Sequence, residues 1–345
     1  MHFQWYPGHM SKAKRMMQED MKLIDVVIEL VDARIPLSSK NPDINQIAGS
    51  KSRVILLNKC DLADDSQNLK WKEYFESQGY IAALVNSKKG DGIRRVNDAV
   101  MEACKAKIER DRKRGILNRP LRAMVVGIPN VGKSTFINSI SGKAAAKTGN
   151  KPGVTKGKQW IKLNKSIELL DTPGILWPKF EDQKVGLHLA LIGSIREEIL
   201  NSYDLSLSLI AFLVRYYKGA LAERYGITES DTPEENLTAV AKKRACLLKG
   251  GELDLERASA FIVDDFRNAK LGKVTLEFPV EQEAPTKQEA STEQEVPEEQ
   301  EFPTEQEFPI EQGMEEDADV STDNEKSTSE KEIAEKPHGD EYTGN

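Results

Sequence analysis

The sequence lacks the features that mark secreted, membrane-spanning and metal-binding proteins. Its 345 residues include only three cysteines, which lie far apart at Cys60, Cys104 and Cys246, so neither a disulfide framework nor a metal-ligand spacing is indicated. No stretch reaches the ~18 consecutive apolar residues of a transmembrane helix. The first residues, MHFQWYPGHMSKAKRM, lack the apolar core of a signal peptide. These absences predict a soluble, cytoplasmic protein with reduced thiols and no membrane partner.

Charge is distributed unevenly along the chain. The formal net charge is −7, yet residues 277–345 hold 23 acidic and 4 basic side chains, which leaves 33 acidic and 45 basic ones over residues 1–276. The acidic stretch repeats the unit E-Q-E-x-P and cannot bury enough apolar surface to offset chain entropy, so we expect a disordered tail. The basic remainder favours a polyanionic partner, with nucleic acid as the first candidate.

Short apolar, β-rich runs alternate with amphipathic stretches through the first half of the chain. Strands are predicted at residues 25–32, 53–58, 81–86, 122–128, 159–163 and 167–171, the last two as a hairpin, and helices at 70–78 and 93–110. This alternation predicts a mostly parallel sheet covered on both faces. Beyond Pro178 only helical patterns recur, at residues 185–200, 205–217, 237–248 and 254–268, and they predict a small helical domain.

The string GIPNVGKS, Gly127–Ser134, follows one predicted strand and precedes a helical pattern. This is the setting of a phosphate-binding loop (P-loop), in which glycines let backbone N–H groups turn toward the phosphates. Lys133 would contact the β- and γ-phosphates, and the Ser134 hydroxyl would ligate Mg²⁺. The string therefore predicts a nucleoside triphosphate as ligand.

Two further strings follow predicted strands and suit a guanine base. In NKCD, Asn58–Asp61, the Asp61 carboxylate would accept two hydrogen bonds from guanine, whereas adenine would leave it without a donor. Asn58 and Lys59 would hold the edge of the base and cover its face. In VNSKK, Val85–Lys89, the amide of Ser87 would face the guanine O6.

Two more strings suit the switch regions that respond to the γ-phosphate. DTPG, Asp171–Gly174, closes a predicted strand, so Asp171 would bind Mg²⁺ through water and the Gly174 amide would contact the γ-phosphate. PGVT, Pro152–Thr155, lies between the P-loop and that strand. Thr155 would ligate Mg²⁺ only in the triphosphate state, which is the conditional contact of a switch.

The order of these motifs is unusual, because both guanine-reading strings precede the P-loop. Joining the usual end of a GTPase domain to its usual beginning gives this order, and domain termini commonly lie close enough for such a join. Cys104–Arg122 would be the joining segment. The predicted fold is α/β: a circularly permuted P-loop GTPase domain with a C-terminal all-helical domain and a disordered acidic tail.

The sequence resembles the circularly permuted GTPases, and most closely the ribosome biogenesis GTPase A family. The strings that carry the resemblance are WYPGHM, DARIPLSSKNP, NKCD, GIPNVGKS, PGVTK and DTPGILWPKFED. The resemblance implies GTP hydrolysis at a late step of large (50S) subunit assembly, with the precursor subunit, its rRNA and ribosomal proteins as partners. It divides the chain into a GTPase domain (1–176, with a basic N-terminal arm at 1–22), an RNA- or ribosome-binding helical domain (177–276) and the tail (277–345), in a monomeric protein.

The motifs and the resemblance together assign a set of site residues. The residues expected to bind GTP are Asn58, Lys59, Cys60, Asp61, Asn86, Ser87, Asn130, Val131, Gly132, Lys133, Ser134, Thr135 and Gly174. Those expected to hold Mg²⁺ are Ser134, Thr155 and Asp171.

The attacking water needs a positioning group, and Ile175 and Leu176 stand where Ras-like enzymes place a glutamine. Alongside Lys133, two catalytic candidates remain. Asn130 resembles the asparagine with which some GTPases hold K⁺, a cation that would neutralise developing phosphate charge. His9 lies in YPGHM, where Pro7 and Gly8 would form a turn. Its imidazole would either lie over the γ-phosphate and act in hydrolysis or only contribute to the packing of the N-terminal arm.

Three functions remain open from the sequence. The first is an RNA-bound GTPase that turns over on a ribosome precursor, and the second is a GTP-dependent RNA-binding module with negligible turnover. The third, a GTPase coupled to RNA modification, would need a second catalytic site, of which the sequence beyond residue 178 shows no sign. Basic side chains near the first switch and along the N-terminal arm form either a polyanion-binding surface or a solvated one. They are Lys143, Lys147, Lys151, Lys156 and Lys158 near the switch, and Lys12, Lys14, Arg15 and Lys22 along the arm.

Overall fold

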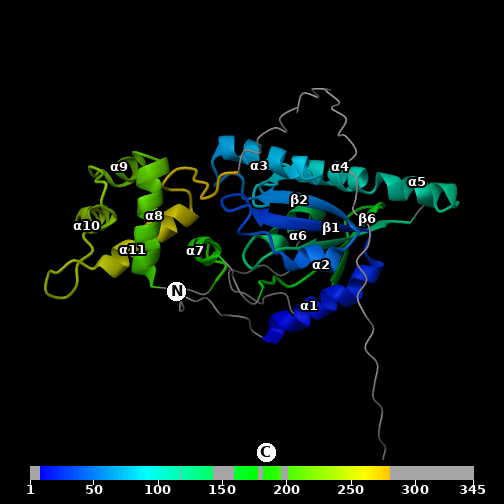
Figure 1. The fold of residues 1–345 in the computed structure, drawn as a ribbon, viewed down its shortest axis with the longest axis horizontal. Coiled ribbons are helices and arrows are strands. Elements are labelled where there is room, and N and C mark those ends of the chain that lie inside the picture. The colour runs from blue at the N-terminus through cyan, green and yellow to red at the C-terminus, as the bar shows by residue number, and fades with distance from the viewer. Residues whose placement is uncertain (1–7, 118, 143–158, 178–181, 196–200, 280–345) are drawn as a thin grey trace, which may run out of the picture. The chain divides into compact units, whose positions relative to one another are not determined.

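A computed structural model describes residues 8–117, 119–142, 159–177, 182–195 and 201–279. Within them a 6-stranded sheet has the order β3-β2-β1-β4-β6-β5 (Figure 1). All of its pairings are parallel except that of β5 with β6. The strands are β1 (Val26–Asp32), β2 (Ser52–Asn58), β3 (Ile81–Val85), β4 (Leu121–Val126), β5 (Gln159–Lys162) and β6 (Ile167–Asp171). The predicted sheet and its terminal hairpin are confirmed.

The register of the parallel strands aligns their carboxyl ends. Asp32 at the end of β1 pairs with Asn58 at the end of β2, and Asn58 pairs with Val85 at the end of β3. On the other side of β1, β4 pairs with β6 so that Val125 faces Asp171. The motifs that follow these strands therefore leave the sheet along one edge.

Helices cover both faces of the sheet, as its two-sided burial requires. They are α1 (Gly8–Asp20), α2 (Asp43–Ala48), α3 (Asp65–Ser77), α4 (Ile93–Ala103), α5 (Lys105–Lys113) and α6 (Lys133–Ser141), with a 3₁₀ turn at Met21–Leu23. Successive residues of β2 face opposite ways: Leu57 packs with Trp71 of α3, whereas Leu56 packs in the cluster that contains Phe136 of α6. The polar Asp64 side chain caps α3 by accepting from the Ser66 and Gln67 amides.

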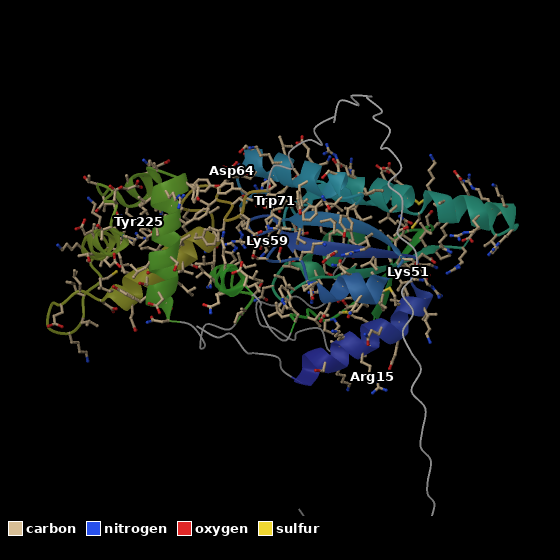
Figure 2. All side chains as sticks on the ribbon, in the orientation of Figure 1. Arg15, Lys51, Lys59, Asp64, Trp71 and Tyr225 are labelled. Carbon is tan, nitrogen blue, oxygen red and sulfur yellow. The ribbon has the colours of Figure 1, made fainter. Side chains whose placement is uncertain are left out.

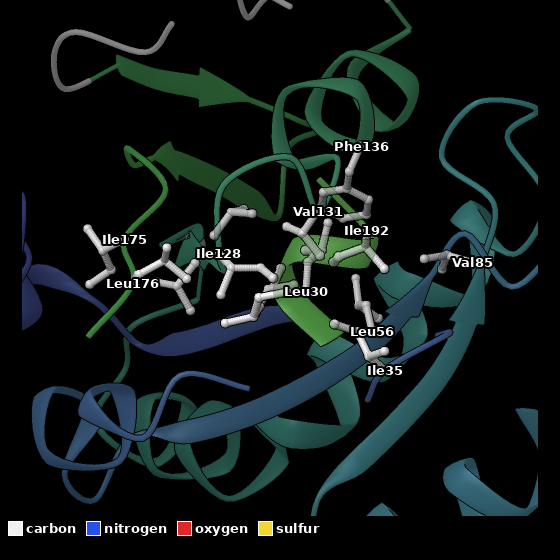
Figure 3. Close-up of a cluster of buried hydrophobic side chains, with 14 of the residues drawn as sticks. Leu30, Ile35, Leu56, Val85, Ile128, Val131, Phe136, Ile175, Leu176 and Ile192 are labelled. Atoms are coloured by element: carbon white, nitrogen blue, oxygen red, sulfur yellow. The ribbon is translucent and has the colours of Figure 1, made fainter. Parts of the chain in front are cut away.

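The remaining elements are helical: α7 (Gln183–Leu191), α8 (Ser202–Tyr216), α9 (Ala220–Tyr225), α10 (Pro233–Lys243) and α11 (Leu255–Arg267). Helix α8 packs against α10 and α11, and the buried hydroxyls of Ser206 and Ser259 meet at 2.8 Å. These helices share their core with the sheet. Figure 3 shows Ile192, just after α7, among the side chains of Val131 and Leu56. The described residues, up to Pro279, accordingly belong to a single compact unit.

Several helix boundaries differ from the predicted ones. The helix expected over 93–110 is split at Cys104 into α4 and α5, and α7 ends at Leu191 rather than continuing toward Leu200. Helix α10 starts earlier than its apolar pattern, with Pro233 in the first turn, and ends before Ala245, whose φ is +49°. Helices α2 and α9 have six residues each and are too short to show a periodic pattern. None of the helices within the described ranges is long and apolar enough to cross a bilayer.

The chain returns to the sheet after α11. The amide of Val274 donates to the Leu62 carbonyl oxygen, and that of Leu276 donates to the Arg34 carbonyl oxygen. The carboxylate of Glu277 accepts from the amides of Leu37 and Ser38, at 2.7 and 3.0 Å. Glu277 thus belongs with the folded part, although the charge pattern assigned it to the tail. Residues 280–345, the rest of that tail, lie outside the described residues.

Candidate functional site

The motifs predicted to bind the nucleotide come together at the carboxyl edge of the sheet. NKCD follows β2, the Ser87 loop follows β3, the P-loop follows β4 and DTPG follows β6. Such an edge is where open α/β sheets bind their ligands. The first switch, with Thr155, lies outside the described residues, and so do the lysines around it.

The P-loop has the conformation that its glycines allow. Gly127 and Gly132 have φ of +153° and +101°, and Asn130 between them has φ of +59°. A β-carbon on Gly127 would lie 2.7 Å from the Leu30 carbonyl oxygen, and one on Gly132 would lie 2.5 Å from the Asn58 side-chain nitrogen. Only glycine fits at these two points. The loop leads into α6, so its backbone N–H groups are available to an anion at the helix amino terminus.

Asn58 connects three of the motifs. Its buried side chain donates through Nδ2 to the Val131 carbonyl oxygen at 2.8 Å. Its Oδ1 accepts from the amide and hydroxyl of Ser87, at 3.1 and 2.7 Å. The guanine motif, the P-loop and the β3 loop are therefore held together by one amide group. The Ser87 amide, which we expected to face guanine, is engaged by Asn58 in this structure, so a base contact would require that bond to be exchanged.

Lys59 attaches the guanine motif to the P-loop in a second way. Lys59 is labelled in Figure 2. Its Nζ donates to the Asn130 carbonyl oxygen at 2.8 Å and pairs with the Asp32 carboxylate at 2.9 Å. Asp32 also accepts from Nε and Nη2 of Arg34, each at 2.8 Å. Burial alone would raise the pKa of Asp32, but the Arg34 guanidinium and the Lys59 ammonium hold it well below its ordinary value. Asp32 was not among the predicted site residues, although its position at a strand end was a usable signal.

The carboxylate of Asp61 is available to accept hydrogen bonds from a base. It is half-buried and has no hydrogen-bond or ion-pair partner among the described residues. Neighbouring residues of its motif are engaged with the P-loop, so Asp61 remains the unpaired acceptor of NKCD. This is the arrangement that recognition of guanine N–H groups requires.

Lys133 and Asp171 lie together beneath the P-loop. The Nζ of buried Lys133 donates to the carbonyl oxygens of Gly127 and Ile128, at 3.0 and 2.9 Å. Burial lowers the pKa of Lys133 to about 8, although nearby Asp171 favours its charged form. Burial raises the pKa of Asp171 in turn. In this structure the Lys133 ammonium group donates only to carbonyl oxygens, and phosphate oxygens would give it an anionic partner.

A Mg²⁺ ion fits this donor set. The Oδ1 atom of Asp171 is buried without a hydrogen-bond partner, which leaves a carboxylate oxygen for a cation or its water. Ser134 opens α6 on the P-loop and offers the second oxygen. Gly174 lies against Lys133 and Pro129, because a β-carbon there would be 2.8 Å from Lys133 Nζ and 2.9 Å from the Pro129 backbone. DTPG therefore lies beside the P-loop lysine, and a contact of the Gly174 amide with the γ-phosphate stays a prediction.

The helical part also contacts the P-loop, which the sequence did not predict. The Asn130 side chain donates through Nδ2 to the Gly193 carbonyl oxygen at 2.7 Å. The fully buried Ser194 donates through Oγ to the Pro129 carbonyl oxygen at 2.8 Å. Arg267 of α11 fixes this segment by donating to the carbonyl oxygens of Ala190 and Leu191, each at 2.8 Å.

The other predicted residues have varied positions. Val131 is buried beneath the loop, Cys60 is half-buried, and Asn86 accepts from the Lys88 and Lys89 amides through Oδ1. Thr135 lies in the first turn of α6. His9 lies in α1, and its side chain is outside the described residues.

Comparison with known proteins agrees with this site. A family profile described as 50S ribosome-binding GTPase matches residues 122–245. A ribosome biogenesis GTPase A from Bacillus cereus is 49% identical over 281 residues, which cover 81% of this chain and 94% of the relative. The Thermotoga maritima protein of that name is 35% identical over 284 residues, covering 81% and 97%.

A solved structure supports the same assignment. The crystal structure of GNP-bound YlqF from T. maritima has 30% sequence identity and a TM-score of 0.54, and it matches 77% of this chain and 98% of its own. The motif order of the sequence and the sheet order observed here thus agree with a permuted GTPase domain. The chain belongs to the ribosome biogenesis GTPase A family: it binds and hydrolyses GTP and has a role in ribosome assembly.

Proposed function

We propose that this GTPase acts on the precursor of the large (50S) ribosomal subunit and hydrolyses GTP at a late step of its assembly. The observation that carries the proposal is that both the guanine motif and the helical part form hydrogen bonds with the P-loop. Asn58 and Lys59 contact it from the guanine motif, and Gly193 and Ser194 contact it from the helical part. A nucleotide-dependent change at the loop therefore has a direct route to the helices.

The residues of the site divide the chemistry between them. Asp61 selects guanine and Lys133 neutralises phosphate oxygens. Ser134 and Thr155 would ligate Mg²⁺ directly and Asp171 would hold it through water, and the ion would act as a Lewis acid toward the phosphates. The residues at 1–176 bind and hydrolyse the nucleotide, those at 177–276 contact rRNA and ribosomal proteins, and the acidic tail competes with RNA for the same basic side chains.

Hydrolysis needs a group that positions water, and the positions after Gly174 do not supply one. Ile175 and Leu176 are both fully buried in the core. The two candidates are Asn130, through a bound K⁺, and His9 at the start of α1. Because Asn130 Nδ2 donates to Gly193, its Oδ1 is left as the atom available to a cation. His9 would act once RNA contact brings the N-terminal segment over the γ-phosphate.

The decisive experiment is co-sedimentation with large subunits and their precursors, in the presence of GDP or a non-hydrolysable GTP analogue, combined with GTP turnover. The proposal expects nucleotide-dependent sedimentation and turnover that rises on adding subunits. Sedimentation without stimulated turnover would favour the alternative, a GTP-dependent RNA-binding module. Replacing His9 with alanine should nearly abolish the stimulation while GTP affinity changes by less than about 1 kcal/mol. If subunits stimulate the variant and the parent equally, His9 is excluded, and Asn130 with a bound K⁺ remains as the candidate that supports hydrolysis.

A further inference from the structure

Helix α5 has a composition that its packing does not explain. It joins α4 to β4, the segment expected to close the permutation, and none of its side chains is buried. Over Lys105–Arg114 the chain carries six cations and two carboxylates. An amphipathic helix normally stabilises itself through an apolar face, and Ile108 is the main apolar residue here.

The two faces of α5 differ in charge. At 3.6 residues per turn, the half-buried residues Lys107, Ile108 and Asp111 lie on one face, toward the sheet. The exposed remainder of the helix carries Lys105, Arg110, Arg112 and Lys113, with Glu109 as its one acidic residue; Arg112 lies at the edge next to Ile108, and the other three lie on the far side. We call these four cations the α5 basic face.

Two nearby carboxylates, those of Asp25 and Asp111, are engaged with the inner side of α5, which leaves Glu109 as the acidic residue among the exposed cations. Lys107 pairs with Asp111 and with Asp25, at 3.3 and 3.4 Å, and Arg119 also pairs with Asp25. The α5 basic face has no ion-pair or hydrogen-bond partner among the described residues. Two cations of helix α1 differ, since Lys14 pairs with Asp43 and Arg15 pairs with Glu19.

The α5 basic face lies far from the nucleotide. Asp25, which contacts Lys107 and Arg119, immediately precedes β1, whereas the nucleotide motifs follow the carboxyl ends of the strands. A seven-residue strand spans about 20 Å. Figure 1 shows α5 continuing past the ends of the strands, away from α7 and α8. These four cations therefore have no role in holding GTP.

We propose that the α5 basic face binds the phosphate backbone of RNA, at the opposite end of the sheet from the GTP site. The inference rests on the proposed function, because the RNA is that of the large-subunit precursor. Unpaired cations on a rigid, exposed helix release condensed counterions when they meet phosphates. Folded RNA presents its backbone and 2′-hydroxyls to such surfaces. Ile116 and Leu117, 42% and 75% exposed just beyond α5, would instead suit a ribosomal protein, and the surplus of cations favours RNA.

The test replaces Lys105, Arg110, Arg112 and Lys113 together with glutamine, which keeps helix propensity. The probe is protein-free rRNA from large subunits, titrated between about 50 and 200 mM salt. We expect the affinity of the variant to fall at least about tenfold and its salt dependence, log K against log salt, to become shallower by about 3 to 4. GTP affinity and thermal stability should match those of the parent chain.

Matched variants separate position from net charge. The double variant Arg112→Gln/Lys113→Gln and the single variant Lys70→Glu, on the exposed side of α3, both change the charge by two units. The proposal requires the first to weaken RNA binding several-fold more than the second. Glu109→Gln, on the α5 basic face itself, should act in the opposite direction and tighten binding.

Each outcome decides the proposal. Equal RNA affinity and salt dependence in the quadruple variant and the parent would overturn it, while the proposed function would stand if the parent sediments with subunits. A loss on intact subunits without a loss on protein-free rRNA would assign α5 to a ribosomal protein and overturn the RNA assignment. Failure of the parent to bind either probe would overturn both.

Discussion

The P-loop is held from two sides, and the two sides differ in how they are built. On the sheet side, Asn58 and Lys59 donate side-chain hydrogen bonds to the carbonyl oxygens of Val131 and Asn130. On the helix side, Ser194 donates to the carbonyl oxygen of Pro129, and Asn130 donates its own side chain to Gly193. The sheet-side donors follow a buried strand, whereas the helix-side groups lie in the connection after α7.

The sheet-side contacts of the P-loop are fixed by strand pairing, whereas the helix-side contacts can change when the helices move. The sheet-side donors keep their places as long as β1, β2 and β3 remain paired in register. The helix-side groups keep theirs only while α7 and α11 stay docked, through Arg267 and its bonds to the α7 carbonyl oxygens. A partner that moves the helices would therefore alter the P-loop from the helix side. Variants on each side sharpen this contrast.

The largest effect should come from Asp32→Asn on the sheet side. The substitution leaves Arg34 and Lys59 without their buried counter-charge, and breaking such a pair costs about 3–5 kcal/mol of unfolding free energy. Urea unfolding at neutral pH measures the loss. Asp65→Asn is the control, because the pair of Asp65 with Lys273 is exposed and should contribute less than about 1 kcal/mol.

The same variant has a pH signature. The pKa of Asp32 is depressed in the folded chain, so its contribution to stability is present above its ordinary pKa of about 3.9 and is lost as pH falls below that value. The stability difference between the parent and Asp32→Asn should therefore shrink in acid. A difference that stays constant from pH 7 to pH 3 would contradict the buried pairing.

Asp61→Asn should remove base recognition and change stability little, since Asp61 has no hydrogen-bond or ion-pair partner among the described residues and only charge interactions with Lys59 and Lys273. One acceptor becomes a donor opposite the guanine N–H groups, at a cost of about 2–4 kcal/mol in GTP affinity. Xanthosine triphosphate has a carbonyl where guanine has its amino group, so it should bind the variant better than GTP does. Unchanged GTP binding, measured by titration calorimetry, would show that the base is read elsewhere.

Two truncations test how the end of the folded part supports the contact between helices and sheet. A chain ending at Leu276 lacks Glu277, whose carboxylate accepts from Leu37 and Ser38 and whose carbonyl oxygen accepts from Trp71 Nε1 at 3.0 Å. A chain ending at Pro279 keeps these bonds. We expect the shorter chain to be less stable by about 2–3 kcal/mol, the scale of a charge-assisted hydrogen-bond set. Equal melting temperatures for the two chains would contradict the anchoring role of Glu277.

On the helix side, Ser194→Ala should weaken GTP binding by about 1 kcal/mol, because the Pro129 carbonyl loses its donor and the free loop gains conformations. Ser206→Ala is the matched control: Ser206 is equally buried and donates to Tyr203 within the helices. Both variants should lose stability, but the stabilisation that GTP adds should fall only in Ser194→Ala. Equal GTP-induced shifts in melting temperature would show that the helix side does not support the loop.

The local parts of this site could be predicted from the sequence. Each nucleotide motif lies at the end of a strand that can be recognised from its apolar run. Parallel strands bring their carboxyl ends to the same edge of the sheet. NKCD, the P-loop and DTPG therefore lie together at the carboxyl edge of the sheet, as their positions after predicted strands required. The strand register that aligns Asp32 with Asn58 follows from the same pattern.

The long-range parts could not be predicted. Asn130 and Gly193 are 63 residues apart, and Pro129 and Ser194 are 65 apart, so their contacts leave no periodic trace in the chain. Glu277 was assigned to the tail because it opens an acidic run, whereas its carboxylate is fixed by two backbone amides. Charge patterning describes the average environment of a segment and does not resolve one residue at its boundary.

The smallest effect is a change in thiol reactivity that reports on the sheet side alone. Burial raises the pKa of both Cys60 and Cys104, the latter to about 11, but Cys60 is half-buried and accessible, whereas Cys104 and Cys246 are buried. A disulfide reagent such as DTNB should therefore titrate a single thiol in the native chain, and Cys60→Ser should abolish the reaction. GTP and GDP should slow it several-fold by covering the motif, while ATP should not. Equal protection by ATP would mean that Cys60 senses occupation of the P-loop rather than of the guanine site, and the two sides of the loop would then be less independent than their contacts indicate.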